Sequence, residues 1–162
     1  MRVLRPPVPN RPSPGFTLPE LLMVVTIIGI IAAYAVPSFN NMMVNERVKS
    51  ASFEVAAALT LARSEAIKQN GSVTLTPTSG TTEWAGGWTV TAPDASVLST
   101  QGAYPSSIVI TGPTSIVYNR SGRSASSTTV TLQVGPATGT AVSPRCISVA
   151  LTGQPKSVLG SC

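Results

Sequence analysis

The chain has 162 residues, enough for one domain and an anchor but too short for two full domains. Charged residues make up only 10% of it and its mean hydropathy is positive, which is a low charge content for a soluble globule. The absence of histidine and the presence of only two cysteines argue against a zinc site, and no serine has a plausible base partner. We therefore expect no metal, no cofactor and no enzymatic activity.

The first fifteen residues form a Pro-rich preamble with no acid and three arginines, Arg2, Arg5 and Arg11. Under the positive-inside tendency such a segment stays in the cytoplasm, and the rest of the chain is sent outward. The run from Leu21 to Val36 then carries no charge at all. Because a bilayer span needs ~20 residues, a single span forms only if it reaches back to Phe16 and includes Glu20.

A cleaved secretory signal is the alternative interpretation of this segment. It would need a small-residue cleavage site after the apolar core, and the sequence "IAAYA" before Val36 resembles such a site. Two features argue against it, because the preamble is unusually rich in proline and the helical pattern continues past Pro37. We therefore expect the apolar segment to be retained as an anchor.

After Pro37, apolar residues recur at intervals of three and four, as on one face of a helix. This stripe is rich in alanine, so its packing partner can come close; it comprises Val48, Ala51, Val55, Ala58, Leu59, Ala62 and Ala66. Charged residues fall on the opposite face, namely Glu46, Lys49, Glu54, Arg63, Glu65 and Lys68. Asn70-Gly71 then predicts a helix stop, since either residue can take the left-handed conformation at a helix C-terminus.

Beyond residue 71 the apolar period becomes two, in short β-branched segments separated by Gly, Pro and Ser. The predicted strands are 72–76, 87–91, 107–111, 115–119, 129–134 and 146–151, with loops at 77–86 and 92–106. Trp88 and Tyr118 are the large side chains expected on the buried sheet face. The chain is thus predicted to have an α+β fold, in which one long N-terminal helix, its apolar half in the membrane, packs against an antiparallel β-sheet.

Cys146 and Cys162 are the two cysteines, and the second is the last residue of the sequence. In a domain exported from the cytoplasm they predict one disulfide. Such a bond contributes on the order of 3 kcal/mol for a loop of this size. Two unpaired thiols are the alternative.

The segment Gly15-Phe16-Thr17-Leu18-Pro19-Glu20, with the apolar run and the later Ala35-Val36-Pro37-Ser38-Phe39, resembles a type IV prepilin. The matching features are a glycine before an aromatic residue, a glutamate at the fifth place after the glycine, and a proline shortly after the apolar run. Pro19 departs from the family pattern, but proline fits the first helical turn, where its missing N–H would be unpaired anyway. The resemblance implies cleavage after Gly15 by a prepilin peptidase and N-methylation of Phe16.

Four later segments resemble the GspH/FimT group of minor pilins and H-type pseudopilins: "ALTLARSEAIKQN", "GGWTV", "VYNRSGR" and "ISVALTGQP". The resemblance implies the type IV pilin fold. It also implies four parts. A cytoplasmic leader at 1–15 is removed, and the helix has a transmembrane and assembly half at 16–37 and an amphipathic half at 38–70. A β-sheet domain with a C-terminal disulfide loop follows at 71–162.

Two compatible explanations account for Glu20. Thr17-x-x-Glu20 matches a capping box, and a carboxylate suits the positive end of the helix macrodipole. The resemblance implies in addition that Glu20 pairs with the α-amino group freed on Phe16, in its own or a neighbouring subunit, during filament assembly. Gly29 and Pro37 are expected to weaken and kink the helix. We interpret this stretch as adaptable during assembly; a kink that only fits the sheet domain is the alternative.

Nucleic-acid binding is an alternative function, because no acid follows Asp94 whereas four basic residues do: Arg120, Arg123, Arg145 and Lys156. Some members of the resembled group bind DNA through a Gly-Arg-x-Arg motif, but the matching place here reads Gly153-Gln154-Pro155-Lys156. The segment Asn119–Arg123 is alternatively a β-turn with two solvated arginines. We expect weak or no binding of duplex DNA at physiological salt.

The expected function is therefore structural, as a minor type IV pilin in the initiation or tip complex of a pilus. Its expected partners are other minor pilins, the major pilin, the prepilin peptidase and the inner-membrane assembly platform. The expected location is the bacterial inner membrane, with a single span and a periplasmic C-terminal domain, and the extracellular pilus after incorporation. Two alternatives stay open: a DNA-binding minor pilin for DNA uptake, and an H-type pseudopilin of type II secretion.

Overall fold

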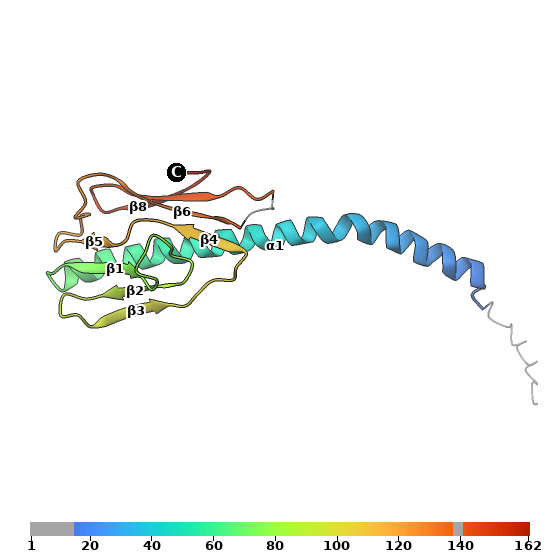
Figure 1. Cartoon of the computed structure of the whole chain (residues 1–162), viewed down its shortest axis with the longest axis horizontal. Helices are drawn as coiled ribbons and strands as arrows, with labels where there is room; N and C mark the ends of the chain where they lie inside the picture. The colour runs from blue at the N-terminus through green and yellow to red at the C-terminus, as the bar shows by residue number, and fades with distance from the viewer. Residues whose placement is uncertain (1–14, 138–140) are drawn as a thin grey trace, which may run out of the picture. The chain divides into compact units, whose positions relative to one another are not determined.

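The computed structural model describes residues 15–137 and 141–162 of the chain (Figure 1). The predicted leader therefore lies outside the described residues, except for Gly15. The chain divides after Ser38 into two compact units, and helix α1 (Leu18–Lys68) contributes to both.

In the first unit, α1 carries the apolar run, and every side chain from Leu21 to Val36 is exposed. By length and composition, α1 is the one helix of the described residues that could cross a membrane. The helix continues without interruption through Gly29 and Pro37, so neither residue ends it.

In the second unit, α1 buries the alanine-rich stripe that its spacing predicts. Six members of the stripe are buried and Ala58 is partly buried; the six are Val48, Ala51, Val55, Leu59, Ala62 and Ala66. Because small side chains line this face, the strands can approach the helix closely.

The predicted helix stop is confirmed and forms a Schellman motif. The Gly71 N–H donates to the Ala66 carbonyl at 3.1 Å and the Asn70 N–H to the Ile67 carbonyl at 3.3 Å. Asn70 takes the left-handed conformation, with φ at 49°. Gly71 is needed for a different reason, because a Cβ at this position would collide with the ring of Pro93.

Within the described residues, eight strands form two antiparallel four-stranded sheets, where the sequence predicted one sheet. The first sheet has the order β3-β2-β1-β5, and the second has the order β4-β6-β7-β8. Figure 1 shows strands of both sheets beside the second half of α1. The strand bounds are β1 Val73–Pro77, β2 Trp88–Thr91, β3 Val97–Gln101, β4 Ile108–Thr111, β5 Ile116–Tyr118, β6 Val130–Pro136, β7 Arg145–Val149 and β8 Pro155–Leu159.

Two strands were missed from the sequence, and both are edge strands. β3 lies in the segment 92–106 that was predicted to be a loop, and β8 follows the last predicted strand. Neither contains a fully buried side chain, so neither has the apolar alternation that marks the central strands. β8 also begins with a proline, which a sheet tolerates at an edge.

One hydrophobic core joins the stripe of α1 to both sheets. Trp88 and Tyr118 are buried in it as predicted. Trp84 was missed because it lies in the predicted loop 77–86, yet it is buried and its indole N–H donates to the Pro113 carbonyl at 2.8 Å. This bond ties the 77–86 segment to the connection between β4 and β5.

Candidate functional site

The predicted processing site lies immediately before α1. Gly15 and Phe16 are both exposed, and Phe16 exposes 76% of its surface. A large apolar side chain this exposed in a described segment is available to a second molecule. The geometry thus leaves the predicted cleavage point accessible.

Glu20 is the third residue of α1, and Thr17 occupies the N-cap position before it. The Glu20 carboxylate accepts a hydrogen bond from the Thr17 backbone N–H, with Oε2 and N separated by 3.4 Å. The reciprocal bond, from the Glu20 N–H to the Thr17 hydroxyl, is absent among the described residues, so half of the predicted capping box forms. The exposed carboxylate keeps one oxygen, Oε1, without a protein partner in the described part of the chain.

This arrangement places a negative charge beside the free N–H groups and the positive dipole end of α1. Cleavage after Gly15 would create a primary amine on Phe16, one residue before the N-cap. A carboxylate and an ammonium group form a charge-assisted hydrogen bond. The start of α1 can therefore hold an amine of its own subunit or of another.

The predicted disulfide is present. Cys146 and Cys162 are joined across a separation of 16 residues, with their Cα atoms 5.0 Å apart. The Cys162 backbone N–H also donates to Gln133 Oε1 at 3.4 Å. The disulfide therefore ties Cys162 to β7, and the hydrogen bond to Gln133 ties it to β6.

The segment Asn119–Arg123 is a tight turn, as its alternative interpretation predicted. The Gly122 N–H donates to the Asn119 carbonyl at 2.8 Å, and Gly122 has φ at 70°. The Asn119 side-chain oxygen accepts from the backbone N–H groups of Ser121 and Arg123 at 3.0 and 3.1 Å. Both arginines of the turn, Arg120 and Arg123, are exposed.

The structure brings three of the four predicted DNA contacts to one end of the strands and leaves the fourth at the other end. Gly153 packs so closely on the Asn119–Arg123 turn that a Cβ there would collide with the Gly122 carbonyl. Lys156 lies three residues later, opposite Ser148 in β7. Arg145 instead pairs with Leu159 at the opposite end of the same two strands. The four residues therefore do not form one continuous basic patch.

Arg63 was placed on the solvent face by its spacing, but the structure shows that it is half-buried. Its Nε atom and the Tyr118 hydroxyl are both buried without a hydrogen-bond partner. Burial raises the pKa of Tyr118 to about 12, and the nearby Arg63 guanidinium opposes that rise. No periodicity signals this proximity, because Arg63 lies in α1 and Tyr118 in β5, far apart in the sequence.

Glu54 was also placed on the solvent face, and it is half-buried. Its carboxylate accepts hydrogen bonds from the Tyr104 hydroxyl and, at 3.0 Å, from Ser50. Burial, and then the Glu54 carboxylate, raise the pKa of Tyr104. The ring of Tyr104 stacks on Trp88 with centroids 5.8 Å apart. The hydrogen bond to Glu54 fastens the segment before β4 to the helix, and the ring contact fastens it to β2.

Two family models match the chain. One, described as Type II transport protein GspH, covers residues 51–153. The other, described as Prokaryotic N-terminal methylation motif, covers residues 10–36. The first spans more than half of the sequence, and the second spans the predicted processing site and the whole apolar run.

Curated relatives match over short stretches. A fimbrial protein of Pseudomonas aeruginosa is 48% identical over 50 residues, which are 31% of this chain and 32% of that protein. The type IV major fimbrial protein FimA of Dichelobacter nodosus is 53% identical over 34 residues, 21% of either chain. The alignments thus span about a third or less of these relatives.

Among solved structures, the type IV minor pilin FimU of Pseudomonas aeruginosa PAO1 is similar in fold. The TM-score is 0.59 at 19% identity, over 68% of this chain and 91% of that chain. A second crystal form of the same protein gives a TM-score of 0.57 at 18% identity.

Proposed function

This chain belongs to the GspH family, as a type IV pilin-like minor pilin or pseudopilin, and from that premise we propose that it supports pilus biogenesis within an initiation or tip complex. One observation carries the proposal. A methylation motif and an apolar helix precede a sheet domain whose fold is similar to that of a type IV minor pilin. A helix of this kind leaves the bilayer favourably only by packing against similar helices.

The apolar half of α1 acts first as a membrane anchor. The N-terminal preamble stays in the cytoplasm, the sheet domain lies in the periplasm, and the peptidase cuts after Gly15. The exposure of Gly15 and Phe16 supports access by the peptidase. The new N-terminus on Phe16 is then methylated, and the anchored protein awaits assembly in the inner membrane.

Glu20 acts next, as the group that meets an N-terminal amine during assembly. Its position at the third residue of α1, with Oε1 free within the described residues, supports this role. The major pilin and other minor pilins supply the neighbouring helices, and the assembly platform of the inner membrane moves the subunit out of the bilayer. Gly29 and Pro37 provide the adaptable stretch of the helix.

A clean deletion tests this function when it is scored in parallel for surface pili, DNA uptake and protein secretion. We expect the loss or strong reduction of surface pili, restored by the wild-type gene. Loss of secretion with normal pili would assign the chain to a type II secretion system instead. Loss of DNA uptake with normal pili would assign it to transformation.

DNA binding is the second candidate, and the cluster of Arg120, Arg123 and Lys156 is the observation that favours it. The separate position of Arg145 and the lack of arginine in Gly153–Lys156 count against it. Few phosphate contacts give only a weak, salt-sensitive affinity. We therefore expect no submicromolar binding of duplex DNA by the purified chain; such binding, lost on Arg120→Ala with Arg123→Ala, would overturn this assignment.

A further inference from the structure

Several basic side chains in the described part of the chain form no ion pair with an acidic residue. Lys49 and Lys68 form ion pairs with Glu46 and Glu65, and Arg47 donates to the Ser107 hydroxyl at 3.2 Å. The other cations of the described residues lack both ion pairs and side-chain hydrogen bonds; these are Arg63, Arg120, Arg123, Arg145 and Lys156. All but Arg145 lie at the end of the sheet domain where α1 stops.

Arg63 is the most informative of these cations, because it is half-buried and still unpaired. Its Nε–H has no acceptor, and neither does the hydroxyl of the fully buried Tyr118 nearby. Both atoms are closed off from solvent, so a second molecule can reach Arg63 only through its terminal guanidinium nitrogens, which are not among these buried unpaired atoms. The guanidinium group of Arg63 has no carboxylate partner among the described residues, so its terminal N–H groups can take one from another molecule.

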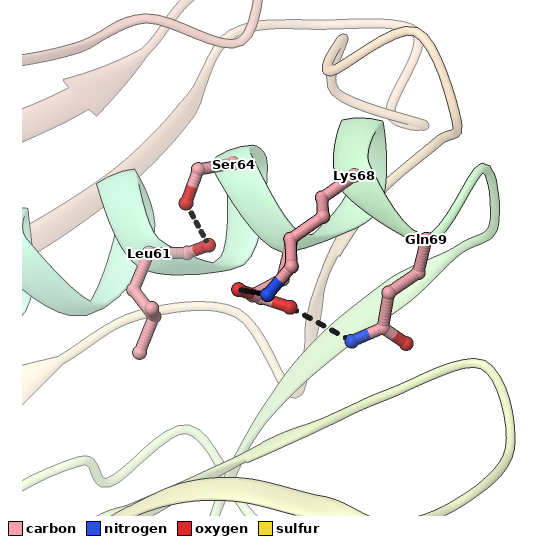
Figure 2. Close-up of polar contacts among 5 residues, drawn as sticks. Leu61, Ser64, Lys68 and Gln69 are labelled. Carbon is pink, nitrogen blue, oxygen red and sulfur yellow. Dashed lines mark hydrogen bonds and ion pairs between the residues drawn. The ribbon is translucent and has the colours of Figure 1, made fainter.

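The nearest acid along α1 is already occupied. The Glu65 carboxylate accepts hydrogen bonds from the side chains of Lys68 and Gln69, at 3.1 and 2.8 Å. Figure 2 labels these two donors and marks the contacts with dashed lines. Hydrogen bonds first from Gln69 and then from Lys68 lower the pKa of Glu65. Glu65 is therefore ionised at neutral pH, and its charge is already paired with Lys68.

The Asn119–Arg123 turn brings further cations to the same place. A Cβ on Gly122 would lie 3.2 Å from Arg63 Cγ, so the turn rests on the aliphatic stem of Arg63. Arg123 follows Gly122 directly and is exposed. Its backbone also lies next to Gly153, since a Cβ on Gly153 would be 3.1 Å from Arg123 Cα. The stem of Arg63 and the backbone of Arg123 thus belong to one packed unit.

We propose that Arg63 and Arg123, with Arg120 beside them, form a docking site for the carboxylates of an acidic segment on a neighbouring protein subunit. The inference rests on the proposed function, which supplies that neighbour as another pilin. Guanidinium groups bind carboxylates through paired N–H donors, and a partly desolvated arginine favours such recognition over a fully hydrated one. No acid of this chain follows Asp94, so the surface repels cationic partners and selects acidic ones.

A protein segment fits this site better than a nucleic acid does. Duplex DNA gains affinity by neutralising many phosphates along a track of cations. Here Arg145 lies at the far end of β7, so the cations form one compact group and no track. One or two carboxylates of a partner are enough to satisfy such a group.

The test titrates the processed full-length chain, solubilised in detergent, with poly-L-glutamate, inorganic phosphate and a short DNA duplex by calorimetry. We expect poly-L-glutamate to bind more tightly than the duplex at equal charge. Arg63→Gln and Arg123→Gln should each weaken that binding about tenfold. Lys49→Gln is the matched control, because Lys49 is an exposed cation of α1 already paired with Glu46; it should leave the affinity unchanged.

Arg123 lies on the surface, so its variant decides the question if Arg63→Gln fails to fold. Equal binding by the wild type and by Arg123→Gln would overturn the proposal, as would the absence of poly-L-glutamate binding or tighter binding of the duplex. Inorganic phosphate that competes with poly-L-glutamate would support a shared anion site. Because the titration needs no pilus, its failure is distinguishable from a failure of the deletion experiment.

Discussion

The Glu20 carboxylate accepts a hydrogen bond from the backbone N–H of Thr17, with 3.4 Å between Oε2 and N. This contact fixes the carboxylate against the first turn of α1 and within one turn of Phe16. The same side chain can therefore cap the helix before cleavage and meet an N-terminal amine after it. Substitutions can separate the two roles, because a cap needs only an acceptor whereas an ion pair needs a charge.

Glu20→Ala should leave cleavage after Gly15 and membrane insertion largely intact while impairing incorporation into filaments. Loss of a cap acceptor costs about 0.5–2 kcal/mol, which a helix of this length tolerates. Immunoblots of sheared pili measure the incorporated protein, and immunoblots of membranes measure the cleaved and inserted protein. Glu20→Gln is the matched control, since it keeps an acceptor for Thr17 but removes the charge. Normal incorporation of Glu20→Gln into filaments would show that Glu20 acts only as a helix cap.

Replacing both cysteines, as Cys146→Ser with Cys162→Ser, should lower the free energy of unfolding by about 3 kcal/mol. The reason is that the unfolded chain gains the entropy that closure of the loop removes. Denaturant unfolding of the processed chain in detergent measures the change. A reductant added to the wild type should reproduce it, and a wild type whose stability is unaffected by reduction would contradict the prediction.

Gly153→Ala should destabilise the domain by about 2–4 kcal/mol, because it adds both a strained backbone conformation and a collision with the Gly122 carbonyl. Gly80→Ala isolates the first contribution, since Gly80 has φ at 67° and open space around its Cβ position. It should cost about 1–2 kcal/mol. Thermal unfolding measures both losses. Equal losses in the two variants would show that Gly153 does not pack on the Asn119–Arg123 turn as described.

The stability of the domain should fall at alkaline pH. Burial raises the pKa of Tyr118 to about 12, whereas a tyrosine in an unfolded chain titrates near 10. The folded state holds this proton more tightly, so the contribution is fully present below about pH 10 and is lost as the pH rises through about 12. Denaturant unfolding across this range measures the decline.

Tyr118→Phe should reduce that alkaline decline and be neutral or slightly stabilising at pH 7, because the buried hydroxyl has no partner. Tyr34→Phe serves as the control, since Tyr34 exposes 80% of its surface on the apolar run. A Tyr118→Phe variant that loses stability at pH 7 would show that the hydroxyl has a partner in solution.

The local features of the fold could be predicted because they depend on residues near one another in the chain. The alanine stripe of α1 follows from helical spacing, and its end follows from the capacity of Asn70 for positive φ. Central strands such as β1 and β6 alternate buried and less buried side chains, so they show a period of two. The disulfide could be predicted because the domain was expected to be exported and the sequence has only two cysteines.

The sequence by itself determined the order of parts, from the Gly15-Phe16 motif with Glu20 through the apolar and amphipathic halves of the helix to the strands. Only the tertiary structure decided that the strands divide into two sheets, that β3 and β8 lie at edges of them, and that the Asn119–Arg123 turn packs on the stem of Arg63. β3 and β8 bury too little to show a period of two, unlike the other edge strands, β4 and β5. A contact between residues far apart in the chain arises from packing, which no local periodicity encodes.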